Sequence, residues 1–423
     1  MTWALAISAL VLIGFAAVSR RLDGTPITPA MVFVGIGLLV GPEVVDGLDI
    51  SPTGHPIKLL AEAALTLVLF ADASRIDLRA LRREYAVPAR LLGIGLPLTI
   101  VAGAAAAAAL FSELTFIEAL VLGVLLAPTD AALGQAVVTM PSLPSRIRQG
   151  LNVESGLNDG ICVPLLFIVL AAAEAQAGIT SDSHAVTIVL EEIGYGILGG
   201  AAAGTLAGAV VVLAGRRGLI APSWLQVVPL AGAALAYGIA APLGGSGFIA
   251  AFVAGMVFGG LRRHGEAEDT YLVEEAGEVL NALTFLVFGA VLLGPSLDHL
   301  SWQTMLYAVL SLTLIRMLPV ALALSGTKAR RPTVTFVGWF GPRGLASIVF
   351  AVIVVEEAHL PHTETILLVT YVTVGLSVLL HGLSAAPLAA RYGRWYESHP
   401  PDHLPPMESV PASHHRWRLP SEG

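Results

Sequence analysis

The stretch Leu151–Gly160 reads L-N-V-E-S-G-L-N-D-G and opens a segment that is otherwise apolar. It carries two carboxylates, Glu154 and Asp159, together with the Ser155 hydroxyl and the Asn158 amide. On a helix, Ser155 and Asp159 are four residues apart and share a face. A carboxylate inside lipid is costly and by default marks an ion or proton pathway. The alternative interpretation is that both carboxylates lie at the water interface and end a helix.

The composition is that of a polytopic helical membrane protein. Hydrophobic residues make up 55% of the 423 residues and charged residues 13%, whereas a soluble domain carries about 25% charged residues. Most of the length is therefore expected to span a bilayer. The single cysteine, Cys162, excludes a disulfide framework and a multi-cysteine metal site. The N-terminus lacks a basic region, so we expect a retained first span and no cleaved signal peptide.

Apolar runs separated by short polar breaks predict an all-α protein with about thirteen transmembrane helices. Several runs are close to the minimum length that crosses a bilayer. The predicted limits are 3–19, 27–41, 58–74, 86–111, 117–139, 150–173, 185–213, 219–241, 246–260, 274–294, 303–325, 332–356 and 364–388.

Every second predicted loop is basic, which sets an orientation. The positive-inside rule places these loops in the cytoplasm of a cell (inner) membrane protein, with the N-terminus outside and the C-terminus inside. Residues 395–423, rich in Pro, His and Ser, are expected to form a short disordered cytoplasmic tail. The basic loop residues are Arg20 and Arg21; Arg75, Arg79, Arg82 and Arg83; Arg146 and Arg148; Arg216 and Arg217; Arg262 and Arg263; Lys328, Arg330 and Arg331; Arg391 and Arg394.

This topology predicts an inverted repeat within a transmembrane domain of residues 1–394. The repeats would cover about 1–173 and 219–388, with a linker helix at 185–213. The fifth span of each half is interrupted by Pro or Gly beside an ionisable residue, in A-P-T-D at Ala127–Asp130 and in G-W-F-G-P-R-G at Gly338–Gly344. Discontinuous helices at matching positions form the substrate site of inverted-repeat transporters.

The linker helix carries a stripe of glycines at four-residue spacing. Such a stripe allows close helix packing. We expect it to pack within the chain, and a seam between two copies is the alternative. The glycines are Gly196, Gly200, Gly204 and Gly208.

Polar residues at the first interruption favour a cation site. Pro128 removes a backbone donor and opens the helix ladder. Freed carbonyls, the Thr129 hydroxyl and the Asp130 carboxylate would then form an oxygen-rich pocket that suits a hard monovalent cation. The alternative is a proline kink capped by Thr129 and Asp130.

Further ionisable residues in the predicted spans need partners or functions. Arg343, between glycines of the second interruption, requires a carboxylate, for which Glu154 is the first candidate and Asp130 the second. Arg316 is a second such arginine, which alternatively snorkels to the interface. Asp72, near the cytoplasmic end of the span 58–74, is an interfacial carboxylate or part of an ion entrance.

Two other classes of protein receive little support. The G-G-S-G at Gly244–Gly247 is similar to the nucleophile motif of rhomboid intramembrane proteases, but it falls at an outer loop and its chemistry needs a histidine base in a span. Only His381 lies in a predicted span. The sequence contains no G-x-x-x-x-G-K-[ST], so no ATP-driven pump is indicated.

Six motifs taken together resemble those of the cation:proton antiporter superfamily, in its NhaP/NHE-like sodium/proton antiporter branch. They run through most of the chain, and E-S-G-L-N-D is the most specific piece. The motifs are L-L-F-A-D-A-S followed by R-I-D-L-R-A-L-R-R, L-A-P-T-D-A-A, L-N-V-E-S-G-L-N-D-G, F-I-A-A-F-V-A-G-M-V-F-G, L-T-F-L-V-F-G-A and G-W-F-G-P-R-G-L-A-S.

The resemblance implies a thirteen-helix homodimer with crossed broken helices that exchanges Na⁺, Li⁺ or K⁺ for H⁺ and needs no cofactor. By motif, Asp159 would be the ion- and proton-binding carboxylate, with Thr129, Ser155 and Asp72 as further ligands. The resemblance also implies that Glu154 and Arg343 form a structural ion pair.

Position 158 resembles the electroneutral branch, because it is an uncharged asparagine. The sequence departs from the family pattern at two positions. Asp72 stands where many relatives have Glu, and Pro342 stands where the family usually has an apolar residue.

The sequence therefore predicts a secondary active transporter, not an enzyme. Its expected partners are a monovalent cation, the proton, the lipid bilayer and a second copy of the chain, with no nucleic acid. The first alternative is a K⁺/H⁺ exchanger or K⁺ efflux system on the same fold. A cation channel is a further alternative, although the chain lacks a repeated filter such as T-V-G-Y-G.

Overall fold

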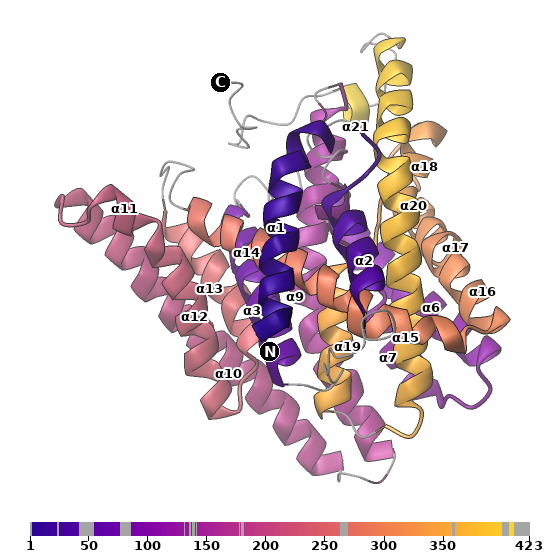
Figure 1. Cartoon of the computed structure of the whole chain (residues 1–423), viewed down its shortest axis with the longest axis horizontal. Helices are drawn as coiled ribbons and strands as arrows, with labels where there is room; N and C mark the ends of the chain where they lie inside the picture. The colour runs from indigo at the N-terminus through magenta and orange to yellow at the C-terminus, as the bar shows by residue number, and fades with distance from the viewer. Residues whose placement is uncertain are drawn as a thin grey trace. The chain divides into compact units, whose positions relative to one another are not determined.

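The computed structural model describes residues 2–22, 25–41, 55–76, 86–130, 132–134, 137, 140, 142–176, 178, 182–262, 270–357, 360–399 and 406–409. Helices dominate these residues, and no strand occurs among them (Figure 1). The predicted all-α polytopic fold is confirmed. The basic residues Arg79, Arg82, Arg83 and Arg263 lie outside the described residues.

The α-helices follow the predicted apolar runs. Four predicted spans each contain two α-helices in the described residues: α5 with α6, α11 with α12, α16 with α17, and α18 with α19. The bounds are α1 (Thr2–Leu22), α2 (Pro29–Val40), α3 (His55–Arg75), α5 (Ala86–Arg90), α6 (Leu96–Leu110), α7 (Phe116–Leu125), α9 (Ser145–Gln176), α10 (Asp182–Ala209), α11 (Pro222–Leu225), α12 (Val227–Ala240), α13 (Gly247–Leu261), α14 (Tyr271–Val287), α15 (Gly294–Ser296), α16 (Trp302–Leu312), α17 (Leu314–Ala323), α18 (Arg331–Trp339), α19 (Leu345–Glu357), α20 (Thr363–Glu397) and α21 (Pro406–Ser409).

Short π-helical and 3₁₀ segments extend several of these helices. They join α5 to α6 and continue α10, α12 and α14 without a loop. The π-helical segments are η1 (Leu91–Gly95), η3 (Val210–Ala214) and η6 (Phe288–Leu293), and the 3₁₀ segments are η2 (Ala132–Gly134), η4 (Ala241–Leu243) and η7 (Leu297–His299).

Length and composition fit a membrane protein. Within the described residues, eight helical segments are long and apolar enough to cross a bilayer, and shorter apolar helices include α2, α7, α13 and α19. Large apolar side chains such as Leu5, Leu10 and Leu198 are exposed on their helices, as expected for side chains that face lipid. The number of crossings stays a prediction.

Polar caps fix where several helices begin. Thr115 and Glu118 form a capping box at the start of α7. Ser246 caps α13 by accepting a hydrogen bond from Ile249 N at 3.3 Å, after Gly244 has turned the chain with φ of +81°. The G-G-S-G stretch is therefore a helix-start turn, which removes the support for a protease nucleophile at Ser246.

Contacts divide the chain into two compact units. The first comprises residues 1–60, 86–158 and 282–412, and the second comprises 61–85, 159–281 and 413–423. Helix α9 passes from the first into the second after Asn158.

The second unit contains the glycine stripe of α10, which packs against α13. A Cβ at Gly200 would fall 2.9 Å from Ala250 Cα, and one at Gly204 would fall 2.8 Å from Ala254 Cα. Only a glycine leaves room for backbones this close. The prediction that the stripe packs within the chain is confirmed, and Figure 1 shows α10, α12 and α13 side by side.

The first unit contains both interruptions, as predicted. Helix α7 ends at Leu125 and the chain continues without helix through Asp130. The second interruption, Phe340–Gly344, separates α18 from α19. The two interruptions meet: Asp130 N donates to Pro342 O at 2.8 Å, and Ser347 Oγ donates to Leu125 O at 2.7 Å. The crossed discontinuous helices are thus present, while the inverted repeat stays a prediction.

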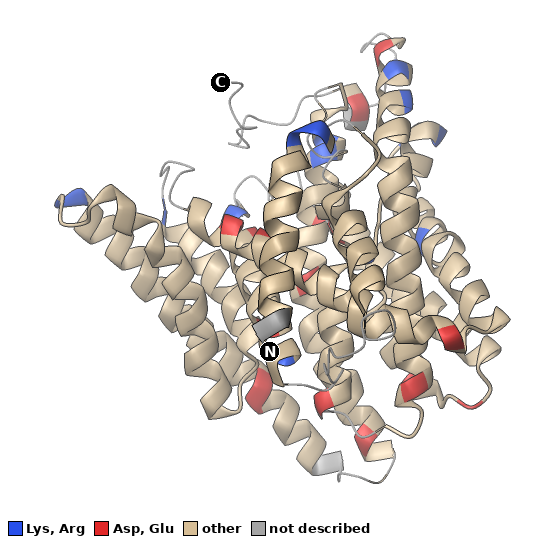
Figure 2. Ribbon diagram, viewed as in Figure 1, with Lys and Arg blue, Asp and Glu red and all other residues tan. Residues whose placement is uncertain are grey.

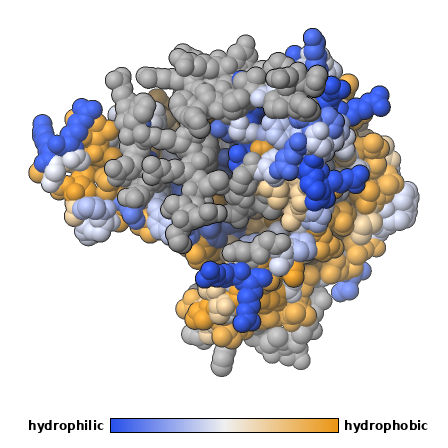
Figure 3. All heavy atoms as spheres, turned by 90° about the horizontal axis from the view of Figure 1, so that it is seen from above, coloured by the Kyte–Doolittle hydropathy of each residue, from blue (hydrophilic) through white to orange (hydrophobic). Residues whose placement is uncertain are grey.

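Several helix ends in the first unit carry charged residues. Arg20 and Arg21 lie in the last turn of α1 and Arg394 in the last turn of α20, and these basic turns lie at the same end in Figure 2. Glu118 and Glu364 lie in the first turns of α7 and α20. Figure 3 looks onto the basic end, where hydrophilic side chains gather beside hydrophobic flanks.

The prediction of a disordered tail from residue 395 needs correction for its described part. Helix α20 continues to Glu397. Glu408 of α21 is only 1% exposed, and its Oε1 accepts hydrogen bonds from Arg330 N at 2.8 Å and Thr333 Oγ at 2.5 Å. This carboxylate caps the start of α18. Residues 400–405 and 410–423, with His403, His414 and His415, lie outside the described residues.

Candidate ion-binding site

One side of α9 carries a buried polar cluster. Glu154, Ser155 and Asn158 are 2%, 4% and 1% exposed. Asp159, 8% exposed, follows Ser155 by one helical turn. The alternative that both carboxylates lie at a water interface does not fit this burial.

Thr129, in the first interruption, connects directly to this cluster. Its Oγ accepts a hydrogen bond from Asn158 Nδ2 at 2.7 Å and lies 3.3 Å from Ser155 Oγ. Its backbone carbonyl accepts a hydrogen bond from the Ser155 hydroxyl. The structure therefore brings Thr129, Ser155 and Asn158 together, as the sequence predicts, and concentrates oxygen atoms where α7 has ended.

Asp130 bonds to backbone amides on both sides of the crossing. Its Oδ1 accepts from Ala132 N at 2.8 Å and its Oδ2 from Leu345 N at 2.9 Å. Leu345 begins α19, so Asp130 acts as a carboxylate cap for that half-helix. Its proximity to Pro342 and Leu345 locks the two interruptions to each other.

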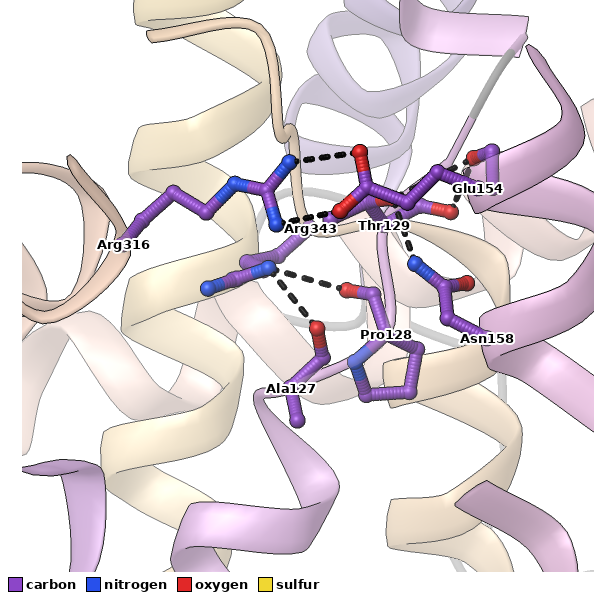
Figure 4. A network of polar contacts seen from close by, with 8 residues as sticks. Ala127, Pro128, Thr129, Glu154, Asn158, Arg316 and Arg343 are labelled. Atoms are coloured by element: carbon purple, nitrogen blue, oxygen red, sulfur yellow. Dashed lines mark hydrogen bonds and ion pairs between the residues drawn. The ribbon is translucent and has the colours of Figure 1, made fainter. Parts of the chain in front are cut away.

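Glu154 forms its ion pair with Arg316. Arg316 Nη1 lies 2.6 Å from Glu154 Oε1 and Arg316 Nη2 lies 2.9 Å from Oε2, a bidentate pair. Figure 4 shows the Arg316 fork, from α17, facing the Glu154 carboxylate from α9. The prediction that Arg343 pairs with Glu154 is wrong, and so is snorkelling by Arg316, which is 2% exposed.

Arg343 instead binds backbone carbonyls of the first interruption. Its Nη1 donates to Ala127 O at 3.0 Å and Pro128 O at 3.2 Å (Figure 4). These carbonyls belong to the non-helical segment that follows α7. The residue is completely buried, and it places positive charge against the carbonyl end of that half-helix, where the helix dipole is negative. The second candidate partner, Asp130, bonds the backbone of Leu345 and Ala132 as described above.

A small cavity of about 20 Å³ lies beside these groups in the first unit. A cavity of this size holds one water-sized guest. Its wall combines the Thr129 and Ser155 hydroxyls and the Asp130 carboxylate with apolar side chains, two of them from the second interruption. The lining residues are Thr129, Asp130, Gly134, Val137, Leu151, Ser155, Phe340 and Pro342.

Asp159 and Asp72 belong to the second unit. Gly160, next to Asp159, packs closely on Phe252, since a Cβ at Gly160 would fall 2.4 Å from the ring. Asp72, with 30% of its side chain exposed, lies 3.9 Å from Arg75 Nη1, and Arg75 also pairs with Glu274. Asp72 is thus part of a carboxylate–arginine cluster at the end of α3.

Comparison with known proteins gives a family and a fold that agree with this architecture. A family model described as the transmembrane sodium/hydrogen exchanger matches residues 6–391. The chain belongs to the sodium/hydrogen exchanger family.

Relatives of this chain include proteins named as Na(+)/H(+) antiporters and proteins named as K(+)/H(+) antiporters. It is 30% identical over 371 residues to the Na(+)/H(+) antiporter NhaP of Pseudomonas aeruginosa, covering 82% of this chain and 83% of the relative. It is 28% identical over 413 residues to the K(+)/H(+) antiporter NhaP of Alkalimonas amylolytica, covering 96% and 69%. A K(+)/H(+) antiporter NhaP2 of Shewanella matches at 27% identity over 91% of this exchanger and 65% of the relative. The chain thus spans about two thirds of the length of these K(+)/H(+) antiporters.

The fold of the chain is also that of a solved structure. The sodium proton antiporter MjNhaP1 from Methanocaldococcus jannaschii superposes with a TM-score of 0.72, covering 90% of this chain and 99% of that one. The two sequences are 21% identical, so this likeness concerns the fold alone.

Sequence reasoning missed several polar residues that support the exchanger's crossing. Arg316 was recognised as an intramembrane charge but not as the partner of Glu154. Ser377 and His381 of α20, which are buried and bonded to the second interruption, were not considered as a pair. Their four-residue spacing on an apolar helix is the signal that could have found them.

Proposed function

We propose that this chain is a secondary antiporter that exchanges a monovalent cation for a proton, with Asp159 as the carboxylate that binds either one. One observation carries the proposal: oxygen atoms of Thr129 and Ser155 gather at an interrupted helix, one helical turn before a buried aspartate on α9. A hard monovalent cation needs oxygen ligands and a nearby negative charge to replace its hydration shell. Asp72 is a further proposed ligand.

Coupling follows from competition at one carboxylate. A proton on Asp159 removes the charge that attracts the cation, and a bound cation disfavours protonation. Alternating access would expose the site to one side of the membrane at a time. The buried Glu154 is held by Arg316, which supports assigning it a structural function.

Asn158 supports an electroneutral exchange of one cation for one proton. Its amide is neutral, and its Nδ2 donates to Thr129 Oγ. Glu154 is bound by Arg316 and Asp130 by backbone amides. Asp159 is then the one carboxylate of this group assigned to titrate during transport.

Na⁺ and K⁺ are both candidates for the transported cation. Relatives named Na(+)/H(+) antiporters and relatives named K(+)/H(+) antiporters match the chain at similar identity. The second candidate function, K⁺/H⁺ exchange, therefore has its own support.

We further propose a homodimer in the cell (inner) membrane, with the N-terminus outside and the basic helix ends in the cytoplasm. The basic last turns of α1 and α20 support this orientation through the positive-inside rule. Cysteine-accessibility labelling at each terminus tests the orientation. The mass of the purified protein in detergent tests the homodimer.

Exchange in proteoliposomes tests the function. The purified protein is reconstituted with an internal pH dye, and Na⁺, K⁺, Li⁺ or choline is added outside. We expect Asp159→Asn to abolish cation-driven proton movement while the protein stays folded. Ser155→Ala and Thr129→Val should raise the apparent KM and keep turnover, because they remove ligands and not the coupling charge.

Thr373→Val is the matched control for these hydroxyl variants. Thr373 is buried on α20 and donates to Val369 O of its own helix, so its exchange should be unchanged. Coupled turnover near the wild-type rate in Asp159→Asn would show that the carboxylate is wrongly assigned. A wild-type protein that exchanges no monovalent cation would refute the proposed function.

A further inference from the structure

Side chains of α20 form hydrogen bonds to backbone atoms at the second interruption that Asp130 does not bind. Breaking a span between α18 and α19 leaves carbonyls at the end of α18 and amides at the start of α19 without partners in their own helices. Leu345 N is bound by Asp130. Two side chains of α20 bind the other end: Ser377 accepts from Arg343 N, and His381 Nε2 contacts Trp339 O, which also accepts from Gly341 N at 2.9 Å.

The donor and the acceptor of each hydrogen bond in this contact follow from the chemistry of the groups. His381 Nε2 lies 2.9 Å from Trp339 O, and a carbonyl only accepts, so Nε2 carries the proton. His381 Nδ1 lies 3.1 Å from the Ser377 carbonyl oxygen and 3.2 Å from the Ser377 hydroxyl. In a neutral ring with its proton on Nε2, Nδ1 is an acceptor, so of these two groups only the hydroxyl can donate to it. Ser377 Oγ in turn accepts from Arg343 N at 2.7 Å. A single chain therefore runs from Arg343 N–H through Ser377 and His381 to Trp339 O.

This chain lies in a fully packed part of the first unit. Ser377 and His381 are 0% and 1% exposed. The indole of Trp339 stacks on the His381 ring at 5.0 Å between centroids, and its Nε1 donates to Ser384 Oγ. Two polar side chains in such surroundings are costly unless they are bonded, and both bond to the backbone of the interruption.

The segment that they hold forms part of the cavity wall. Phe340 and Pro342 lie between the two anchored positions and line the cavity beside Thr129 and Ser155. Arg343, whose amide Ser377 binds, carries the guanidinium that contacts Ala127 O and Pro128 O. Movement of this segment would therefore change both the cavity and the end of α7.

We propose that Ser377 and His381 are positioning residues for cation binding: as one hydrogen-bonded couple they fix the Trp339–Arg343 segment and thereby the shape of the cation cavity. The proposal rests on the proposed function, because it assigns the cavity to the transported cation. Neither side chain lines the cavity itself, so they act through the segment between them.

Cation titrations of reconstituted variants test the couple. Ser377→Ala removes the acceptor of Arg343 N, and His381→Phe keeps a ring on Trp339 and loses both hydrogen bonds. We expect each to raise the apparent KM for the cation about five- to tenfold, the effect of one lost hydrogen bond, with turnover at saturating cation within about twofold of wild type. The double variant should resemble the single variants, since the couple acts as a unit.

Conservative variants separate positioning from general stability. Ser377→Thr keeps the hydroxyl and should restore the wild-type KM. Ser384→Ala is the matched control, because Ser384 bonds the indole of Trp339 and not the backbone of the interruption; its KM should be unchanged. In detergent, the rise in Tm on adding the transported cation should be smaller in Ser377→Ala and His381→Phe than in Ser384→Ala.

The outcomes are distinguishable. If the wild-type protein exchanges or binds no monovalent cation, the proposed function fails. If wild type exchanges and folded Ser377→Ala and His381→Phe keep its KM and its cation-dependent Tm rise, the couple has no positioning function. If these two variants do not fold, His381→Gln, which keeps a donor for Trp339 O, takes their place; a KM raised about threefold supports the proposal and an unchanged KM overturns it.

Discussion

Glu154 of α9 and Arg316 of α17 form a buried, bidentate ion pair. Both of its hydrogen bonds are short, at 2.6 and 2.9 Å, and both side chains are buried. Removing one partner leaves a buried charge without compensation, which costs about 3–5 kcal/mol. Glu154→Gln and Arg316→Ala should therefore each lower the Tm of the purified protein and its yield, as measured by thermal unfolding in detergent.

The reversed pair, Glu154→Arg with Arg316→Glu, should recover part of the lost stability. Glu191→Gln serves as control, because Glu191 is an exposed carboxylate on α10, and its Tm should stay at the wild-type value. Single variants of Glu154 and Arg316 that are as stable as wild type would contradict the importance of the pair.

The proposed role of Asp159 predicts a specific pH dependence of exchange. Because one proton competes with one cation, the apparent cation affinity should weaken as pH falls, by up to about tenfold per pH unit below the pKa of the site. The exchange rate should pass through a maximum, since low pH opposes cation binding and high pH opposes proton binding. Initial rates across a matrix of pH and cation concentration measure this, and an apparent KM independent of pH would contradict single-site competition.

The polar residues of the site could be predicted from the sequence, but their pairing could not. Burial of Glu154, Ser155 and Asn158 follows from their place in an apolar span. The contact of Thr129 with Ser155 agrees with the prediction from two neighbouring motifs. The partner of Glu154 depends on how α17 is rotated relative to α9, which hydropathy does not encode. Arg316 and Arg343 were equally charged candidates, and only the geometry distinguishes the arginine that meets a carboxylate from the one that meets carbonyls.

Among the elements, the crossing of the two interrupted spans depends on close backbone approach at Gly344. A Cβ at this position would fall 2.7 Å from Asp130 Cβ, and Asp130 cannot retreat without losing Leu345 N and Ala132 N. Gly344→Ala should therefore destabilise the protein by about 1–3 kcal/mol through overpacking and reduce exchange.

Gly238→Ala provides the matched control for this prediction. Gly238 lies in α12, and a Cβ there would meet nothing within 4 Å. Alanine favours helix more than glycine does, so this variant should be neutral or slightly more stable. Equal unfolding temperatures and equal exchange for the two alanine variants would show that the crossing tolerates a wider approach than we infer.

Most helices could be predicted from the sequence, because a helix that crosses a bilayer needs a long run of apolar residues. The interruptions were predictable as well, since Pro128 and the glycines around Arg343 disfavour continuous helix. The stripe on α10 indicated a close helix contact but not α13 as its partner. Docking of Glu408 on α18 was missed because a Pro- and His-rich tail has no periodic pattern, and a single carboxylate cap leaves no signal in composition.

For the molecule as a whole, charge balance is the clearest functional prediction. If Asn158 is neutral and Asp159 is the titrating group, as we propose, one cation should exchange for one proton and no net charge should cross the membrane. A membrane potential of either sign, imposed with K⁺ and valinomycin during Na⁺/H⁺ exchange, should leave the rate unchanged. A transport current on a solid-supported membrane would contradict this and would point to a second titrating group, for which Asp130→Asn is the first variant to record.

The Arg316–Glu154 pair also bears on how such a sequence can diverge. The two residues are 162 positions apart in the sequence, so a single point mutation changes only one of them. A protein in which only one of the two has lost its charge carries a buried charge without its partner. Drift at either position alone is therefore opposed by selection, whereas joint replacement by two apolar residues is physically permitted. Among descendants of this gene, positions 154 and 316 should change together or not at all. An alignment of these descendants should therefore show covariation between the two positions.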